Sequence, residues 1–567
     1  MKINSIKIEN FRNLDQLAVN FSSTINYIVG ENNIGKSNLL CCLNKVFNAK
    51  SFEKKDFKDI NKEIRIDFTL SINDDEVGVF DDLIDPENSN SINIYARQEN
   101  YEEYLKFYHK ETDESISNSL IRKTNIISYD SLRNPKNELD FSKTKGAGLF
   151  LNYIVGHYVD NKGSNVSYLK KDAVKGLEKY TETTLKNLSV FERFNIYPEM
   201  EGDVKELLSR ILVLKDNNNM ELSETGYGVQ FNMLIILSIF EKIIDFAKKR
   251  KDEKTFSTIL IFDEPEIHLY PYLQRTIVKD ILKIAKGEDE KFNKILKKLF
   301  DIDKIDGQVI IATHSSNIIE KDYKKIIRLF SNNNLVDGIS GESLELSEKD
   351  NKQLEMQFEY VKEAIFAKAV IIVEGESEFG CFNKFAEKMN IDFDRSSIAL
   401  IKANGANSII PLMDMFNAFG IQSVGVIDRD KESETQSAVH LNRFYTTSKC
   451  FDSEIVENII TKRKYKKLEE ILVAYDQHGI NRNIQKGKLE KIIKDFRYED
   501  VTVNKDYRFD QVTHSDRIYK VMYVAWFENN KGVLLGKIIG DLLSKNEIPI
   551  CYQNAIKKVK ELSDING

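Results

Sequence analysis

The sequence lacks the cysteine spacing of a zinc ribbon and of a disulfide framework. It has five cysteines, none of them in a C-x-x-C pair: Cys41, Cys42, Cys381, Cys450 and Cys551. Both classes are therefore excluded. The chain also lacks an excess of positive charge, because its net charge is −7. That balance argues against a protein that coats nucleic acid with its whole surface, but it is compatible with a local basic groove.

Long apolar segments are missing as well. The first residues, MKINSIKIENF, alternate polar and apolar side chains and lack the apolar core of a signal peptide. The longest apolar stretch, around residues 233–240, is far too short to span a membrane. We therefore expect a cytoplasmic protein without a membrane partner. Its 567 residues, of which 41% are hydrophobic, predict two to four domains.

The first half of the chain contains a candidate phosphate loop between a strand expected at 25–29 and a helix expected at 38–48. The loop matches G-x-x-x-x-G-K-[ST], and its sequence is Gly30-Glu31-Asn32-Asn33-Ile34-Gly35-Lys36-Ser37. Glycines let backbone N–H groups close around phosphate, and the helix presents its positive end to the anion. Lys36 would bridge the β- and γ-phosphates of ATP, and Ser37 would hold Mg²⁺. The other nucleotide-binding candidates here are Gly30, Asn33, Gly35 and Asn38.

A strand expected at 258–262 ends in two acids. Asp263 would lie near Mg²⁺, and Glu264 would polarise the water that attacks ATP. Such a strand end is often an ordinary surface turn, but together with the phosphate loop it indicates a nucleotide hydrolase.

Two weaker motifs accompany this pair. Ser223 and Gly226, in LSETGYGVQ, precede an apolar helix expected at 231–247 and could bring donors to a γ-phosphate. A loop with a helix cap explains them equally well. His314 follows a strand expected at 308–312 and fits a γ-phosphate sensor, although most single histidines are structural.

The second half begins another α/β unit, with strands expected at 369–373, 397–400 and 423–427 and helices at 356–367, 377–389 and 406–419. The first strand delivers Glu374 at its carboxyl end. The third delivers Asp428 and Asp430, whose side chains point the same way on an extended backbone. Because ligand sites in open α/β sheets collect at that edge, these acids predict a Mg²⁺ or Mn²⁺ site.

The fold class that we predict is α/β, with two domains at 1–340 and 361–567 and a polar linker at 341–360. A charged helical run at about 155–215 is expected as an insertion in the first domain, and it could mediate dimerisation. Basic runs at 462–467 (KRKYKK) and 486–497 could follow a DNA backbone, or they could be solvated helix faces.

The segment Asn10-Phe11-Arg12-Asn13-Leu14, together with DEPE and ATHSS, resembles the ABC-type ATPase head of the family that includes RecF and SMC proteins. The resemblance implies an ATP sandwich in which the signature motif of one subunit completes the site of another, hence a homodimer or homotetramer. It also adds Arg12 to the nucleotide-binding residues. The chain departs from the pattern twice: the signature is not LSGGQ, and Tyr270 stands where many members have histidine.

The E-G strand end followed by D-x-D resembles the Toprim pattern of topoisomerases, bacterial primases, recombination-repair proteins and OLD-family nucleases. An ABC head followed directly by Toprim resembles the OLD (overcoming lysogenization defect) family, which includes the Gabija anti-phage nuclease subunit, over nearly the full chain. A primase is disfavoured because Cys/His zinc ligands are lacking. A topoisomerase is disfavoured because little chain is left for a domain with a nucleophilic tyrosine.

The OLD resemblance implies further site residues. Glu378 and Glu454 would be additional metal ligands, and Lys531 would stabilise the charge of the transition state. The matches around the last two are short. Asp452 or Glu457 could replace Glu454, and Lys537 could replace Lys531.

The function implied is that of an ATP-binding, metal-dependent DNA endonuclease in anti-phage defence, with phage or plasmid DNA as substrate and a helicase-type partner. Its catalytic residues would be Glu374, Asp428, Asp430 and Lys531, with Glu264 serving the ATPase. Two alternatives stay open: an ABC-type DNA clamp with a structural Toprim domain, and a Toprim enzyme that cleaves RNA under the control of an ATPase sensor.

Overall fold

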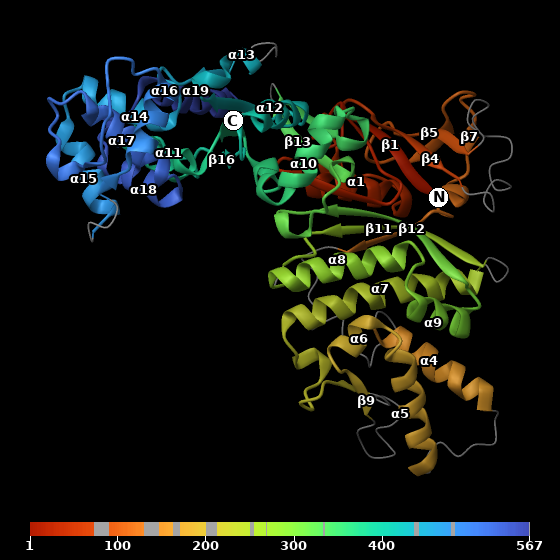
Figure 1. Cartoon of the computed structure of the whole chain (residues 1–567). Helices are drawn as coiled ribbons and strands as arrows, with labels where there is room; N and C mark the ends of the chain where they lie inside the picture. Colours follow the sequence, from red (N-terminus) through yellow and green to blue (C-terminus); the bar gives the residue numbers. More distant parts are fainter. Residues whose placement is uncertain are drawn as a thin grey trace. The chain divides into compact units, whose positions relative to one another are not determined.

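The computed structural model divides into two compact units, Met1–Ser343 and Leu344–Gly567 (Figure 1). It describes residues 1–72, 90–129, 147–162, 171–199, 213–249, 254–267, 269–332, 335–435, 442–477 and 482–565. Across these ranges, none of the helices has the length and apolarity needed to cross a membrane.

The first unit contains an antiparallel sheet with the strand order β2-β1-β4-β5-β6-β7. Its strands are β1 (Lys2–Glu9), β2 (Leu17–Asn20), β4 (Ile64–Ser71), β5 (Ser91–Gln98), β6 (Lys106–His109) and β7 (Ser115–Ile116). β1 pairs with β2 in the antiparallel direction, and Ile6 and Ile8 are buried, so the polar–apolar alternation at the N-terminus is that of a strand with one buried face.

The second sheet of this unit has the order β14-β13-β3-β12-β11-β8, and all its pairs are parallel except β13–β14. Its strands are β3 (Ile25–Gly30), β8 (Asn125–Tyr129), β11 (Thr255–Asp263), β12 (Lys304–Ala312), β13 (Ile326–Asn332) and β14 (Leu335–Ser340). The surrounding helices are α1 (Lys36–Asn48), α2 (Asn118–Ile121), α7 (Tyr227–Lys249), α8 (Pro271–Ala285) and α9 (Glu290–Phe300). The apolar runs in β3, β11 and β12 are buried, as strands covered on both faces require.

The expected insertion is helical in its first part. It contains α4 (Ala147–Lys162), α5 (Lys171–Leu185) and α6 (Ser189–Arg193), which Figure 1 shows beyond α7 and away from the parallel sheet. It then includes an antiparallel pair, β9 (Tyr197–Glu199) with β10 (Val213–Lys215), which the sequence did not predict. Residues 163–170 and 200–212 of the expected insertion lie outside the described residues.

The second unit is built on a four-stranded parallel sheet with the order β16-β15-β17-β18. Its strands are β15 (Ala369–Val373), β16 (Ile398–Lys402), β17 (Gln422–Ile427) and β18 (Arg443–Tyr445). The helices are α11 (Glu376–Lys388), α12 (Ile409–Ala418), α13 (Glu432–Thr435), α14 (Phe451–Thr461), α15 (Tyr465–Tyr475), α16 (Lys486–Phe496), α17 (Ile518–Asn529), α18 (Val533–Leu542) and α19 (Ile550–Ile565), with a short pair of β19 (Asn483–Ile484) and β20 (Tyr507–Arg508). Because β15 lies between β16 and β17, the strand order reverses at its carboxyl end, where ligand sites of such sheets form.

The stretch expected as a linker is largely regular structure. Residues 348–361 form α10 (Glu348–Val361), which packs on α12 and β16, and Gln357 Nε2 donates a hydrogen bond to the Ala403 carbonyl at 2.7 Å. The polar composition had predicted a linker, but the polar residues lie on the exposed side of this helix. Phe358 and Val361 on its other side are buried.

Candidate functional site

The predicted phosphate loop has the backbone that its glycines were expected to permit. β3 ends at Gly30 and α1 begins at Lys36. Gly30 and Gly35 have φ angles of 147° and 118°. A Cβ atom would lie 2.3 Å from the Leu329 carbonyl oxygen at Gly30, and 2.6 Å from Leu14 Cδ2 at Gly35. Both positions therefore require glycine.

Lys36 folds over this loop. Its ammonium group donates to the carbonyl oxygens of Gly30 (2.9 Å) and Glu31 (2.7 Å). Burial lowers the pKa of Lys36 to about 8, although the charges of Glu264 and Asp263 oppose that shift. A phosphate in the loop would give this buried cation a counter-charge, so the residues present fit a nucleotide.

β11 and β3 are separated in the sheet by one strand, β12. The acids that follow β11 therefore end at the same edge of the sheet as the phosphate loop that follows β3. Ser37 Oγ donates to Asp263 Oδ1 at 3.1 Å, which unites the two predicted ligands of Mg²⁺. Glu264 has a left-handed backbone (φ 49°), and its Oε1 lies 3.3 Å from His314 Nε2. Burial and the charge of Lys36 lower the pKa of His314, so this imidazole is neutral at pH 7. A neutral imidazole can donate a hydrogen bond to Glu264 and leave the negative charge of that carboxylate in place.

Glu266 is a member of this corner to which the sequence assigned no role. Its Oε1 accepts hydrogen bonds from Thr313 Oγ1 (2.7 Å) and from the His314 backbone (2.8 Å). Glu266 therefore ties the turn after β11 to the turn after β12 and positions His314. The signal was the third acid of DEPE, two residues after Glu264, to which a role was assigned.

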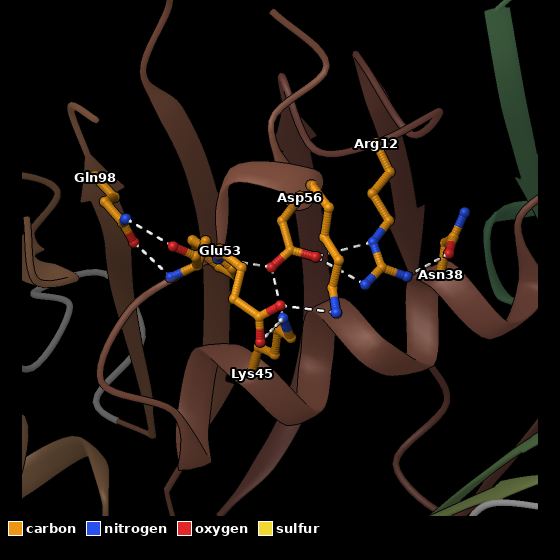
Figure 2. A network of polar contacts seen from close by, with 8 residues as sticks. Arg12, Asn38, Lys45, Glu53, Asp56 and Gln98 are labelled. Atoms are coloured by element: carbon orange, nitrogen blue, oxygen red, sulfur yellow. Dashed lines mark hydrogen bonds and ion pairs between the residues drawn. The ribbon is translucent and has the colours of Figure 1, made fainter. Parts of the chain in front are cut away.

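Arg12 is bound to a buried carboxylate that the sequence did not single out (Figure 2). Its Nη2 and Nε donate to Asp56 Oδ1 at 2.7 and 3.0 Å, and Lys45 Nζ donates to Asp56 Oδ2 at 2.5 Å. Burial would raise the pKa of Asp56, but the hydrogen bonds from Lys45, the Glu53 backbone and Arg12 outweigh it and lower that pKa.

The same network reaches the phosphate loop. Arg12 Nη1 donates to Asn38 Oδ1 at 2.7 Å, a contact visible in Figure 2. Asn38 Nδ2 then donates to Asn13 Oδ1 (2.7 Å), and Asn13 Nδ2 donates to the Ile34 carbonyl (3.0 Å). Arg12 and Asn38 thus brace the loop from outside, and Asn33 takes the left-handed backbone (φ 62°) within it.

Ser223 and Gly226 lie in another part of the unit. The 3-10 turn Leu222–Glu224 contacts α7 and β10, and a Cβ atom on Gly226 would meet nothing within 4 Å. The side chain of Ser223 is outside the described part of the chain. Apart from Arg12, which follows β1, the remaining nucleotide-binding candidates gather at the carboxyl ends of β3, β11 and β12 or on α1.

In the second unit, a cavity of about 240 Å³ opens at the carboxyl ends of β15 and β17. The charged residues on its wall are Glu374, Glu376, Glu378, Asp428, Asp452 and Lys531. Glu374 follows β15 directly and Asp428 follows β17, while Glu378 lies one turn into α11. Adjacent parallel strands therefore bring together acids that are far apart in the sequence.

The buried acids of this cavity are short of counter-charge. Burial, reinforced by neighbouring carboxylates, raises the pKa of Asp428 to about 9 and that of Glu378 to about 7. Among the described residues, Glu374 Oε2 and Asp452 Oδ1 are buried without a hydrogen-bond partner. Among the described residues, no three acids, cysteines or histidines are placed close enough together to hold a metal ion. Carboxylate oxygens without partners are still the type of ligand that a hard divalent cation takes.

Lys531 reaches the cavity through tight helix packing. Its ammonium group lies 2.8 Å from Asp452 Oδ2, and the Gly532 backbone donates to Ser377 Oγ at 3.1 Å. A Cβ atom on Gly536 would lie 1.9 Å from the Ser377 carbonyl oxygen, so α18 touches α11 backbone to backbone. Lys531 lies just before α18 instead of at its start, and it lines the cavity, whereas Lys537 is not among the lining residues.

Glu454, predicted as a metal ligand with Asp452 or Glu457 as alternatives, lies away from the cavity wall. Its Oε2 accepts from the Ser448 backbone (2.6 Å) and its Oε1 from Cys551 Sγ (3.5 Å), and it does not line the cavity. Asp452 lines it instead, because two positions along α14 rotate a side chain by about 200°. Glu457, the other alternative, accepts from Ser448 Oγ at 2.7 Å and is likewise not on the cavity wall.

Asp430 is also placed differently from the expectation. Asp428 is the N-cap of a 3-10 turn, Arg429–Lys431, so the backbone is not extended and the two carboxylates do not align. Asp430 is exposed. The pKa of Glu374 is raised mainly by the burial of Glu374 itself, and the negative charge of Asp430 adds to that rise. Asp428 meanwhile accepts a hydrogen bond from the Phe451 backbone at 3.0 Å, which fixes the start of α14 near β17.

Two family models match the chain. The model of an AAA ATPase domain matches residues 1–146 and 158–319, which contain the phosphate loop and the acids after β11. The model of an overcoming lysogenization defect protein-like TOPRIM domain matches residues 365–430, which contain Glu374 and Asp428. It ends before Asp452 and Lys531.

Three relatives align with this chain over most of their own length. The Old nuclease of Escherichia phage P2 is 20% identical over 81% of this chain and 82% of its own. Endonuclease GajA of Bacillus cereus (strain VD045) is 24% identical over 76% of each chain. The DNA replication and repair protein RecF of Francisella tularensis is 22% identical over 47% of this chain and 82% of its own. Among solved structures, an SMC head bound to the C-terminal winged-helix domain of ScpA covers 60% of this chain with 14% identity and a TM-score of 0.36, which does not by itself establish a shared fold.

Proposed function

We propose that this chain, which belongs to the AAA ATPase domain family and carries an OLD-like Toprim domain, is an ATP-regulated, divalent-metal-dependent DNA endonuclease. The observation that carries the proposal is the cavity in which Glu374, Glu378, Asp428 and Asp452 face Lys531. The relatives named nuclease and endonuclease, which match this chain over three quarters or more of its length, support the same class of enzyme.

The acids of the cavity would hold the divalent ion, with Glu374, Glu378, Asp428 and Asp452 as ligands. When bound, such an ion neutralises phosphate charge and makes water a better nucleophile. Without it, Asp428 keeps a proton at neutral pH because its pKa is raised to about 9. Binding of the divalent ion therefore requires the Asp428 carboxyl group to release its proton.

Lys531 would contact the phosphodiester directly. It is 52% exposed, yet it is held by Asp452, which is fully buried. Although burial opposes it, the charge of Asp452 raises the pKa of Lys531, so the ammonium form persists at all physiological pH values. A fixed cation at this place stabilises the negative charge that develops on the phosphate as the bond to the leaving oxygen breaks.

The first unit would bind and hydrolyse ATP. Lys36 would exchange its hydrogen bonds to Gly30 and Glu31 for bonds to phosphate oxygens, and Ser37 with Asp263 would hold Mg²⁺. Glu264 would take a proton from the attacking water, with neutral His314 orienting its carboxylate.

The assembly that we propose is a homodimer or homotetramer in which Ser223 and Gly226 complete the nucleotide site of a second copy. Its support is the resemblance to ABC-type heads, together with the place of both residues at the turn that leads into α7. DNA as the substrate is supported by the name of the RecF relative and by the nuclease relatives. A cytoplasmic location, a role in anti-phage defence and a helicase-type partner are proposed on the OLD resemblance.

Cleavage of supercoiled plasmid tests the function. The protein is incubated with Mg²⁺ or Mn²⁺, with and without ATP, and compared with the Glu374→Ala and Lys36→Ala variants. We expect the wild type to nick or linearise the plasmid and Glu374→Ala to leave it intact. The Lys36→Ala lanes measure control by nucleotide. A wild type that leaves DNA intact under both metals but cleaves RNA would favour the RNA enzyme, and one that binds DNA without cleaving either would favour the clamp.

A further inference from the structure

Lysine ammonium groups surround one carboxylate beside the cavity. Glu528, on α17, forms an ion pair with Lys488 of α16, and the two helices pack together. Burial would raise the pKa of Glu528, but the charges of Lys488, Lys531 and Lys491 lower it. Glu528 stands three residues before Lys531, which lines the cavity, so its ion pair places Lys488 near the cavity rim.

The lysines of α16 share one flank of the helix. Lys488 and Lys491 are three positions apart, and the buried side of α16 is formed by Leu489 and Ile492. Lys491 is exposed, and among the described residues no carboxylate lies within ion-pair distance of it. Its charge is therefore available to a ligand in solution.

Lys449 continues the basic flank at the other end of α16. Its Nζ donates to the Asp495 carbonyl oxygen at 2.9 Å and lies 4.6 Å from the ring centre of Phe496. Lys449 immediately precedes Cys450, the N-cap of α14, whose first two residues line the cavity. Lys488 and Lys491 on α16, with Lys449 at the carboxyl end of that helix, are thus three cations next to segments that line the cavity.

The other basic run of the sequence, residues 462–467, has its described contacts away from the cavity. Lys462 Nζ donates to the Asn546 carbonyl at 2.7 Å, and Lys467 forms an ion pair with Glu470 at 2.7 Å. Lys464 and Lys466 are exposed at the start of α15, and no contact described for this run reaches the cavity. The run 462–467 supports the turn between α18 and α19 instead.

We propose that Lys449, Lys488 and Lys491, here named the α16 track, hold the phosphate backbone of DNA beside the acidic cavity. This inference rests on the proposed nuclease function. The acids of the cavity repel the phosphates on either side of the scissile bond, so a cationic surface continuous with the cavity is needed to hold the strand. Neutralising phosphates also releases condensed counterions, which favours binding. Glu528 is the resident counter-charge that keeps Lys488 in place before DNA arrives.

The test compares variants of equal charge in the full chain, in a Glu374→Ala background that prevents cleavage. Binding of a fluorescein-labelled duplex in Mg²⁺ is followed by anisotropy at several salt concentrations. The double variant Lys488→Gln/Lys491→Gln should bind on the order of tenfold more weakly, and the slope of log K against log salt should shrink by about 1.8. The matched control Lys464→Gln/Lys466→Gln should stay within twofold of its parent.

Glu528→Gln supplies a change in the opposite direction. Removing the counter-charge should tighten DNA binding, a result that a merely damaged fold would not give. Equal losses in both lysine pairs, or weaker binding by Glu528→Gln, would overturn the α16 track. If the wild type cleaves plasmid while the Lys488→Gln/Lys491→Gln variant binds like its control, the inference fails and the nuclease stands. If the wild type neither binds nor cleaves DNA, the proposed function fails as well.

Discussion

Asp452 and Lys531 form an ion pair between a fully buried carboxylate and an ammonium group that is 52% exposed, with 2.8 Å between Oδ2 and Nζ. Asp452 is the second residue of α14, Lys531 precedes α18, and both line the acidic cavity. The buried carboxylate thus holds the position of the exposed ammonium group at the cavity wall.

The Asp452→Asn variant tests this pair. It keeps the shape of the side chain but removes the charge that holds Lys531, so we expect plasmid cleavage to fall at least about tenfold. The matched control is Glu454→Gln on the same helix, which should keep most of the activity because Glu454 bonds to Ser448 and Cys551. Greater loss in Glu454→Gln than in Asp452→Asn would restore Glu454 as the metal ligand.

The stability of the metal-free protein should fall as pH rises. The pKa of Asp428 is 3.8 without its environment and about 9 in the folded chain. Between these values the folded state binds a proton that the unfolded state has lost, so this stabilisation is complete below pH 3.8 and is lost as pH rises towards 9. Thermal melts in EDTA between pH 5 and 9 should show a flatter profile for Asp428→Asn than for the wild type. Identical profiles would contradict the raised pKa.

Glu264→Gln should separate ATP hydrolysis from ATP binding. Replacing the carboxylate removes the proton acceptor, and we expect hydrolysis to slow by about a hundredfold or more. The dissociation constant for ATP should change little, because Lys36 and the loop supply the binding. Isothermal titration and phosphate release measure the two quantities. A large loss of affinity in Glu264→Gln would instead mean that this residue holds the nucleotide.

Asp56→Asn should weaken both the fold and the nucleotide site. The change leaves Arg12 and Lys45 without their shared buried counter-charge, and we expect the free energy of unfolding to fall by about 3 kcal/mol. ATP affinity should fall with it, because Arg12 braces the loop through Asn38. Glu53→Gln is the control: its carboxylate is 59% exposed and also faces Lys45, so its loss should lower the free energy of unfolding far less than Asp56→Asn does. Denaturant unfolding with and without ATP gives both results.

Gly536→Ala should disturb the cavity from outside it. The added methyl group would lie 1.9 Å from the Ser377 carbonyl oxygen, so α18 must move away from α11 and carry Lys531 with it. We expect a lower melting temperature and a loss of plasmid cleavage. Gly487→Ala is a control on another helix, where a Cβ atom meets nothing within 4 Å. A Gly536→Ala protein that melts and cleaves like Gly487→Ala would show that the contact is not needed.

The sequence alone predicted those features that a single short segment forms by itself. The phosphate loop is such a case, because Gly30 and Gly35 occupy backbone conformations that side chains rarely adopt. Glu374 is another, since a buried strand must end where its apolar run ends. The fold class followed from the same strands and helices, and the family models agree with it.

Tertiary structure alone decided which distant side chains meet. Asp452 lines the cavity and Glu454 does not, because the rotation of α14 decides which of two nearby acids faces it. Asp56 reaches Arg12 only when the antiparallel sheet has formed, and composition had marked α10 as a linker because helix and loop can be equally polar. The sequence by itself determined the chemistry at strand ends and glycine turns, where geometry is local. The choice among neighbouring acids and lysines belonged to the packed chain, because helix rotation and burial are set by contacts between segments far apart in the sequence.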